Sequence, residues 1–437
     1  MTASQAQARL DDAIAALLAS EPAALADPYS LFERMRREDP VHPHGRFVFL
    51  TRYDDVHRLL QDTSDRYTKR YDRSAHLTEF VASLSPADQA AVEEYYAFVN
   101  LWMQRADLDV HARLRRISHR AFTPRRVAQM QAAVERYADG LIASFAGEEV
   151  VDLTTFAFDL PLMVIVDMLG CPGEDRLLIR DWSAAIGEHL DRDSVTTLSA
   201  AVRAIREFGV YVDEIIAGHR GRREEDDLIA ALLAADEQGG LTTEELKAMF
   251  ILLLFAGHET TANLIGTGTL QLLTHREQWE RLCREPGRMP GAIEELLRFV
   301  SPVQWITRVA AKDHEIAGVP VPAGHVVLGI VAAANRDPAV FEDPEALDVA
   351  RTGRHLGFGF GTRFCLGASL ARLEGVVALS LLTARFPDMQ LVDDTHAFTS
   401  NAVLRRLVRL PVRLGPDRGP GAYRAVDPTQ FAPGSAA

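Results

Sequence analysis

Cysteine is scarce in this sequence, and the way it is spaced limits the possible classes of protein. Only three cysteines occur in 437 residues, at positions 171, 283 and 365, and none forms a close pair. Neither a disulfide framework nor a zinc site is supported, and a reducing cytoplasm is the expected location. The first residues lack the basic start and apolar core of a signal peptide. The longest apolar run, at 250–257, is shorter than the about 20 residues that span a bilayer, so we expect a soluble protein with no membrane partner.

Positive charge is also in short supply. The chain has 47 Lys and Arg against 61 Asp and Glu, and its net charge of −14 argues against a nucleic-acid partner. A phosphate-binding loop is unsupported, because no Gly-Lys-Ser/Thr follows the glycine-rich stretch at 357–367. The middle of the sequence contains no internal repeat and no low-complexity linker. We predict one catalytic domain at 27–414, an N-terminal extension at 1–26 and a weakly ordered C-terminal tail at 415–437.

Local patterns predict several elements. Asp27 is a natural N-cap for a helix at 28–38. Apolar spacing predicts a strand at 46–52 and a helix at 53–60. The clearest later strand is the apolar run at 326–331. A charged, exposed turn is expected at 220–227.

The glycine-rich stretch at 357–367 contains the third cysteine. Its glycines permit backbone angles and close approaches that other residues resist, so Cys365 can lie under a flat ligand. Good helix formers follow from Ala368, and unpaired N–H groups at a helix N-terminus favour a thiolate. Such a thiolate suits a haem iron. The alternative is a buried, inert cysteine, which is what we expect for Cys171 and Cys283.

The pattern Phe-x-x-Gly-x-Arg-x-Cys-x-Gly at 358–367 resembles the haem-binding loop of the cytochrome P-450 family. The resemblance covers roughly 27–412. It implies a mainly α fold with small β-sheets, the cytochrome P-450 fold. It implies haem b (iron protoporphyrin IX) as cofactor, with Cys365 as the axial iron ligand. The loop residues expected to contact the haem are Phe358, Gly359, Arg363, Cys365 and Gly367.

A long buried helix is predicted after Thr242, which forms a capping box with Glu245. At 256–261 this helix has small residues, an acid and a hydroxyl where a core helix normally carries leucine. Glycine there costs roughly 1 kcal/mol relative to alanine, and a buried carboxylate without a partner costs more. The motif resembles the acid-alcohol pair of the same family. That resemblance implies proton delivery by Glu259 and Thr260, and haem contacts from Ala256 and Thr260.

Arginines cluster at 111–126, although the chain as a whole is acidic. A solvated helix face is the default interpretation of such a run. His111 and Arg115 are spaced i, i+4, so one helix face presents both, and together they can bind a pair of carboxylates. In the resembled family such a pair holds the haem propionates. The resemblance also implies that Arg308 and Arg363 bind propionates, and we expect the other arginines of this run to face an acidic electron donor.

Three charged residues are expected to be structural. Glu295 and Arg298 are spaced i, i+3 on one predicted helix, which alone is weak evidence because surface helices carry many such pairs. Their order relative to Arg351 and Cys365 resembles the family's Glu-x-x-Arg plus Arg triad. We expect this triad to brace the segment that precedes the cysteine loop.

The substrate pocket is predicted less directly. The region 65–109 is rich in aromatic residues and reads as a long irregular segment, typical of a lid or substrate loop, with core packing as the alternative. The pocket residues expected from the resemblance are Trp102, Leu252, Phe255, Gln304, Trp305 and Val403. A mixture of aromatic and aliphatic side chains suits a medium-sized, largely apolar substrate such as a natural-product intermediate.

Together these features predict a monooxygenase that uses O2 and inserts one oxygen atom into an organic molecule. Electrons are expected from NAD(P)H through a separate ferredoxin reductase and ferredoxin, because no flavin or iron-sulfur domain fits in the chain. Three alternatives stay open at this point: a peroxide-driven peroxygenase, an oxidase that couples rings, and a non-catalytic haem sensor or carrier. The Glu259-Thr260 pair speaks against the peroxygenase, because peroxide brings its own protons.

Overall fold

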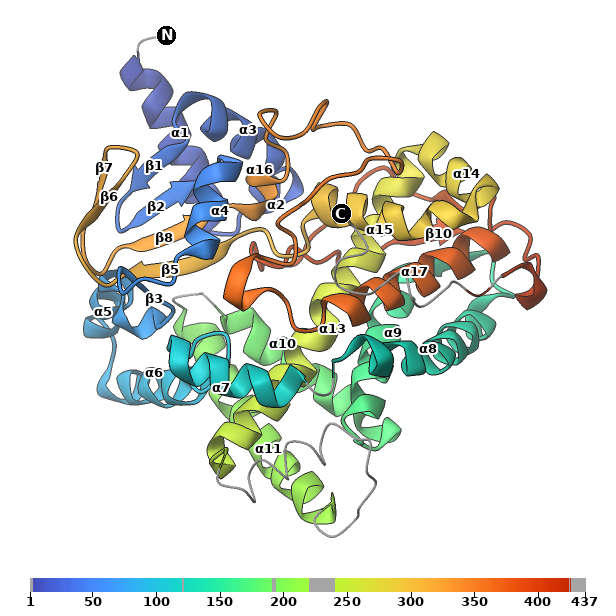
Figure 1. Cartoon of the computed structure of the whole chain (residues 1–437), viewed down its shortest axis with the longest axis horizontal. Coiled ribbons are helices and arrows are strands. Elements are labelled where there is room, and N and C mark those ends of the chain that lie inside the picture. Colours follow the sequence, from blue (N-terminus) through green and yellow to red (C-terminus); the bar gives the residue numbers. More distant parts are fainter. Residues whose placement is uncertain (1–2, 120–121, 191–193, 220–239, 424, 426–437) are drawn as a thin grey trace.

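Helices dominate the computed structural model, which describes residues 3–119, 122–190, 194–219, 240–423 and 425 (Figure 1). The α-helices are α1 (Ala3–Leu18), α2 (Pro22–Ala26), α3 (Tyr29–Glu38), α4 (Tyr53–Gln61), α5 (Ala75–Ala82), α6 (Pro86–Val99), α7 (Leu108–His119), α8 (Pro124–Phe145), α9 (Leu153–Met168), α10 (Arg176–His189), α11 (Val195–His219), α13 (Thr243–Thr274), α14 (Arg276–Arg284), α15 (Met289–Val300), α16 (Val331–Ala334) and α17 (Ala368–Arg385). The short 3-10 helices are η1 (Tyr71–Arg73), η2 (Gly173–Asp175), η3 (Pro286–Arg288), η4 (Gly361–Arg363) and η5 (Pro420–Ala422).

The strands are few and short. They are β1 (Val41–His44), β2 (Phe47–Leu50), β3 (Tyr67–Thr68), β4 (Val150–Asp152), β5 (Ile306–Ala310), β6 (His314–Ile316), β7 (Val319–Val321), β8 (Val326–Gly329), β9 (Gln390–Leu391) and β10 (Pro411–Arg413). The largest sheet has the order β1-β2-β8-β5-β3, and its β2 and β8 pair in parallel although nearly 300 residues separate them. This sheet therefore joins the N-terminal region to the segment that leads into the cysteine loop. The predicted mainly α architecture with small sheets is confirmed.

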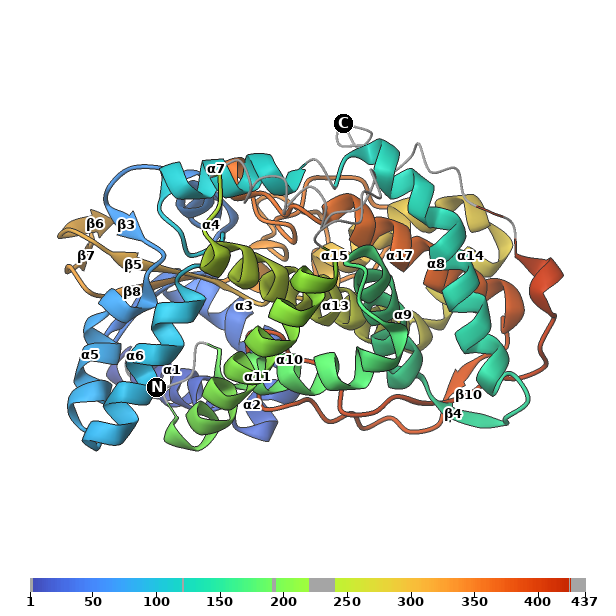
Figure 2. The ribbon, with the colours of Figure 1, turned by 90° about the horizontal axis from the view of Figure 1, so that it is seen from below.

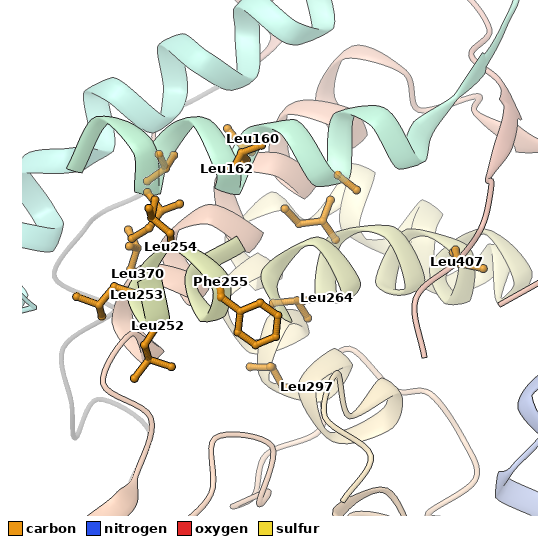
Figure 3. Packing of buried hydrophobic residues seen from close by; sticks show 14 of the residues in the cluster. Leu160, Leu162, Leu252, Leu253, Leu254, Phe255, Leu264, Leu297, Leu370 and Leu407 are labelled. Atoms are coloured by element: carbon orange, nitrogen blue, oxygen red, sulfur yellow. The ribbon is translucent and has the colours of Figure 1, made fainter. Parts of the chain in front are cut away.

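Helix α13 crosses the middle of the molecule, with α9, α10 and α11 on one side and α15 and α17 on another (Figures 1 and 2). The predicted capping box is present, because the Thr242 hydroxyl accepts from the Glu245 N–H and the Glu245 carboxylate accepts from the Thr242 N–H. Leucines of α9 and α13 pack against each other along the crossing (Figure 3). At Gly257 an added Cβ would lie 2.8 Å from Cγ1 of Ile165, so the two helices approach closely there.

Length and composition alone would allow α13 to span a membrane. The predicted long buried helix after Thr242 is confirmed, and the apolar run at 250–257 is only part of its 32 residues. However, 83% of its most hydrophobic window is buried inside the protein. A helix that is apolar on all sides and packed on all sides is a core helix.

The region 65–109 is mostly helical, so the predicted long irregular segment is wrong. Ser74 caps α5 and Ser85 caps α6, in each case with its hydroxyl accepting a backbone N–H three residues later. Tyr95 and Trp102 are both almost fully buried, and core packing is the better account of the Tyr95 ring.

Both chain ends pack on the body of the protein over their described parts. Leu10, Ile14 and Leu17 of α1 are buried. Beyond β10, Asp417 accepts from the buried Arg385 at 2.5 and 3.0 Å, so the start of the predicted weakly ordered tail is tied down. Residues 424 and 426–437 of that tail, and the predicted turn at 220–227, lie outside the described residues.

Candidate functional site

The cysteine loop is a tight turn that ends at a helix. Gly359 and Gly361 have φ of +71° and +70°, a backbone conformation that side-chain-bearing residues rarely adopt. The N–H of Cys365 donates to the carbonyl of Phe358 at 2.9 Å and so closes the turn. Helix α17 begins three residues after Cys365, with Gly367 as its N-cap. The sequence prediction of a cysteine directly before a helix N-terminus is confirmed.

The accessibility of Cys365 and its close protein surroundings together indicate a hollow beside the Cys365 thiol. The residue is exposed by surface area, yet protein surrounds it closely enough for desolvation to raise the pKa of the thiol. The Gly367 N–H and the positive charges of Arg115 and Arg372 act in the opposite direction and lower that pKa. An accessible thiol enclosed by protein and facing cations is a good ligand for a soft metal centre.

Cations gather beside this hollow without matching anions. Arg308 on β5 is 4% exposed, and its only hydrogen bond within the described structure is to the neighbouring Thr307 carbonyl at 2.9 Å. Burial, followed by the charge of Arg363, lowers the pKa of Arg308 to about 9. Burial, followed by the charges of Arg308, Arg363 and Arg105, lowers the pKa of Lys69 well below its usual value.

Arg115 also faces this region. It makes no hydrogen bond or ion pair with any described residue, but its charge acts on Cys365. Burial lowers the pKa of Arg115, as it does for Arg308. Lys69, Arg115 and Arg308 thus lie near this hollow, and most of their side-chain N–H groups have no hydrogen-bond acceptor among the described residues.

His111 and Arg363 are instead engaged with the chain. Burial lowers the pKa of His111. Its Nδ1 lies 3.0 Å from the Met103 carbonyl oxygen and 3.2 Å from Arg363 Nη1, and its Nε2 lies 3.2 Å from the Thr362 carbonyl oxygen. Arg363 also donates to the Ala106 carbonyl at 2.7 Å. This network joins α7 and the loop before it to the cysteine loop.

Helix α13 has a short gap in its packing. Between Ala248 and Leu270 this helix is buried except at Ala256, Gly257 and Thr260. The Thr260 hydroxyl donates to the Ala256 carbonyl at 3.2 Å. Ala256 and Thr260 lie one turn apart on the same helix face and leave room there that leucine would fill, whereas Gly257 is packed against Ile165.

Glu259 lies on a different face of α13, where it has partners. It is 6% exposed and forms an ion pair with Arg406, at 3.3 Å from Nη1 to Oε1. His258 Nε2 lies 3.8 Å from the same oxygen, and the Nδ1–H donates to the Leu254 carbonyl at 2.6 Å. Arg406 also lines a cavity of about 330 Å³ together with Asp159, Arg180 and Asn263. Through its ion pair, Glu259 is therefore in contact with a residue that lines this cavity.

Most of the predicted pocket residues are buried apolar side chains, whereas Gln304 is hydrogen-bonded to the backbone. Trp102 stacks on Phe255 with ring centroids 5.6 Å apart, and the Trp102 indole N–H has no partner among the described residues. Gln304 turns to the chain, since its Nε2 donates to the Val300 and Ser301 carbonyls at 3.0 and 2.6 Å. Its backbone N–H donates to the Val403 carbonyl at 2.8 Å. Leu252 and Trp305 are both buried.

The expected structural triad is assembled. Arg298 is 2% exposed, and its guanidinium donates to both carboxylate oxygens of Glu295 at 2.7 and 2.8 Å. It also donates to the carbonyls of Asn335, Pro344 and Ala346. Arg351 Nε adds a third contact to Glu295, at 3.2 Å from Oε1. The triad thus holds the chain between β8 and the cysteine loop against α15.

Four residues of interest were not found from the sequence. Lys69, Arg105 and Arg406 carry no local motif, and only their neighbours in the fold indicate a role. Glu374 on α17 is 1% exposed, and burial raises its pKa well above the usual value despite a hydrogen bond with Thr261. Its position nine residues after Cys365, within the predicted helix, is the sequence feature that could have indicated it.

The assembled residues fit a haem. The enclosed Cys365 thiol suits an iron ligand, and the opening in α13 lies where a flat group needs room. The under-used cations Lys69, Arg115 and Arg308 suit two carboxylates on its edge. In the described structure Asp62 acts on Arg308 only at a distance, and none of the three cations forms an ion pair with a carboxylate, so an external anion would offset the cost of burying them.

Comparisons with known proteins agree with this arrangement. The profile of the family described as "Cytochrome P450" matches residues 190–395. Polyketide biosynthesis cytochrome P450 PksS of Bacillus subtilis is 37% identical over 401 residues, which cover 89% of this chain and 96% of that protein. The 6-deoxyerythronolide B hydroxylase of Saccharopolyspora erythraea is 37% identical over 400 residues, covering 89% and 96%.

A solved structure gives the same result for the fold. The cytochrome P450 enzyme CxnD, for C–S bond formation in chuangxinmycin biosynthesis, superimposes with a TM-score of 0.79 at 33% identity. The match covers 90% of this chain and 95% of that one. The fold predicted from the cysteine loop is therefore confirmed over most of the chain.

Proposed function

Because the chain belongs to the cytochrome P450 family, we propose that Cys365 is the axial thiolate of its haem and that the enzyme oxidises a medium-sized, largely apolar organic molecule. Family membership makes the protein a haem-thiolate monooxygenase with iron protoporphyrin IX as cofactor. The observation that carries the assignment of the site is the cluster of cations without carboxylate ion pairs near the Cys365 thiol, of which Arg308 is buried and Lys69 and Arg115 are half-buried.

In this proposal the cations position the cofactor. Lys69, Arg115 and Arg308 bind the two propionates, because their donors are largely unused within the described structure. Arg363 and His111 act differently: they connect the cysteine loop to α7 and so fix the place of the Cys365 sulfur. Phe358 supports the loop from below, with its ring 4.6 Å from the Arg372 guanidinium carbon.

The bound haem supplies the redox chemistry that activates O2. The chain supplies the protons. Glu259 receives them from water in the cavity lined by Arg406, and the Arg406 ion pair holds this carboxylate beside that cavity. Thr260 gives up its hydrogen bond to the Ala256 carbonyl at 3.2 Å and turns its O–H toward the hollow. In this proposal Glu259 accepts protons from water and Thr260 donates a hydrogen bond within the site.

The substrate side of the hollow is largely apolar. Trp102 and Phe255 form a stacked wall, and Leu252 extends that wall along α13. The unpartnered Trp102 N–H offers one hydrogen bond to a carbonyl or hydroxyl. Together with relatives named for polyketide and macrolide substrates, these residues favour a natural-product intermediate in secondary metabolism.

Electrons come from a separate partner in this proposal. Arg116 and Arg125 are exposed near the ends of α7 and α8, and this basic face suits an acidic ferredoxin reduced by an NAD(P)H-dependent reductase. Arg113 does not belong to that face, because it forms an ion pair with Glu245 at 2.5 Å. The enzyme and its partners would operate in the cytoplasm.

The carbon monoxide difference spectrum of the dithionite-reduced protein tests the site. A strongly red-shifted Soret band in the wild type, lost in Cys365→Ser, is the expected result. Cys171→Ser is the matched control and should keep the band, because that buried thiol lies away from the hollow. A band typical of a histidine-ligated haem in the wild type would overturn the assignment of Cys365.

The reaction type is tested through Thr260. Thr260→Ala should uncouple NADPH oxidation from product formation and leave peroxide-driven turnover intact, because peroxide brings its own protons. NADPH-driven turnover that is unchanged by this substitution would remove Thr260 from the mechanism. Product analysis then separates hydroxylation from ring coupling.

A further inference from the structure

Three metal-ligating side chains meet at the N-terminal end of the molecule, away from the haem site. Asp11 of α1 places its Oδ1 3.0 Å from Nε2 of His42 and 3.0 Å from Nδ1 of His44, both on β1. The ligand atoms of all three residues lie within 4.8 Å of one another. The haem-dependent function uses none of them.

Local structure explains why they meet. Alternate residues of a strand point to the same face, so His42 and His44 project together from β1, which is the edge strand of the large sheet. Helix α1 lies beside this strand in Figure 1, and Leu10 and Ile14 fasten it to the core. Asp11 follows Leu10 and therefore lies at the rim of that contact.

The donor set suits a zinc ion. Zinc accepts histidine nitrogen and carboxylate oxygen at about 2.0–2.2 Å, so a tetrahedral site holds its ligand atoms about 3.4 Å apart. The two observed separations of 3.0 Å are close to that spacing. The third separation, between Nε2 of His42 and Nδ1 of His44, can adjust by rotation of the His44 side chain, which is 25% exposed.

The surroundings of the cluster support this interpretation. His42 is fully buried, and its Nδ1 lies 2.9 Å from Oδ2 of Asp39, which directs Nε2 toward Asp11. A carboxylate behind a ligating histidine is a recurrent feature of metal sites, where it fixes the orientation of the ring. The Asp11 side chain is 38% exposed, so an ion and a water ligand can reach the cluster from solvent.

We propose that Asp11, His42 and His44 bind a Zn²⁺ ion whose fourth ligand is water. The ion would fasten α1 to the edge of the large sheet and so make the N-terminal segment part of the folded enzyme. The site is independent of catalysis. Its competing explanation is a set of ion pairs between protonated histidines and the two aspartates, and this explanation requires no metal.

The test is a titration of the tag-free, haem-loaded, EDTA-treated enzyme with ZnCl₂, followed by calorimetry. One equivalent should bind, and the thermal midpoint should rise by about 3 °C when free zinc is about 100 times the Kd. Asp11→Asn and His44→Gln should each abolish stoichiometric binding. Asp39→Asn should weaken it by about 10- to 100-fold.

His119→Ala is the matched control, because His119 is an exposed histidine outside the cluster, and this variant should bind zinc like the wild type. The carbon monoxide spectrum of each variant shows that the haem site is intact. Failure of the wild type to bind one equivalent overturns the proposal. Undiminished zinc binding by Asp11→Asn and His44→Gln also overturns the proposal. If Asp11→Asn loses the same stability with and without zinc, the cluster consists of ion pairs alone.

Discussion

Replacing Arg308 with methionine should have opposite effects on the haem-free and the haem-loaded protein. Burial lowers the pKa of this guanidinium from 12.5 to about 9. At about 1.36 kcal/mol per pKa unit, holding the charge there costs about 5 kcal/mol. A base whose pKa is depressed by folding destabilises the fold at every pH below that pKa, and the cost is lost only as the pH rises through it. At pH 7 the whole cost is present.

A propionate placed against Arg308 would remove most of this cost, so the same charge that burdens the haem-free chain would favour haem binding. We expect Arg308→Met to release haem at least about 100-fold faster, which corresponds to about 2.7 kcal/mol of the available 5. The haem-free variant should be more stable than the haem-free wild type. Methionine has a similar length and no charge, so loss of packing is small.

Transfer of haem to excess apomyoglobin, followed at the Soret band, measures the release. Thermal denaturation of both forms measures stability. Arg405→Met is the matched control: Arg405 is 8% exposed and donates to the Leu25 and Ala26 carbonyls at 2.7 and 2.6 Å. It should destabilise both forms and leave haem release unchanged. Arg308→Met with wild-type release, and with a haem-free form destabilised like Arg405→Met, would refute the reasoning.

Three other substitutions have defined outcomes. Arg298→Lys should cost about 3–5 kcal/mol in urea unfolding, because lysine cannot serve Glu295 and three carbonyls at once; a loss below 1 kcal/mol would contradict this. Burial raises the pKa of Glu374, so above about pH 4.5 the wild-type free energy of unfolding should fall by about 1.4 kcal/mol per pH unit, and Glu374→Gln should remove that slope. Parallel pH curves for the two proteins would contradict this prediction. Arg406→Met should increase the peroxide released per NADPH, since Glu259 loses its ion pair; unchanged coupling would remove Arg406 from proton delivery.

Signals that lie within a few residues of each other predicted the structure well. The capping box at Thr242 and the cysteine loop are both local patterns, and both are present. The helix predicted at 28–38 is α3, with the Asp27 carboxylate accepting from Tyr29 N–H at 3.1 Å. The serine caps of α5 and α6 were equally local, but the aromatic content of 65–109 outweighed them.

Signals that depend on tertiary pairing could not be predicted. Arg385 and Asp417 are 32 residues apart in sequence, and their ion pair fixes the start of the tail. Arg406 and Glu259 are 147 residues apart, and neither the turn that carries Arg406 nor its chemistry marks it as a partner. In both cases the residue types are ordinary, and only the fold brings them together.

Lys69 shows most clearly how the fold creates a site that sequence does not reveal. Strand β3 ends at Thr68, which pairs with Val309 of β5, and Lys69 follows directly, close enough to Arg308 for that charge to lower the Lys69 pKa. Like charges near each other repel, and burial increases that penalty. The chain is acidic overall and has carboxylates to spare, yet within the described residues none forms an ion pair with either cation. An anion supplied from outside the chain is the arrangement that makes this pair favourable, and the propionates of the haem are of the right charge and number.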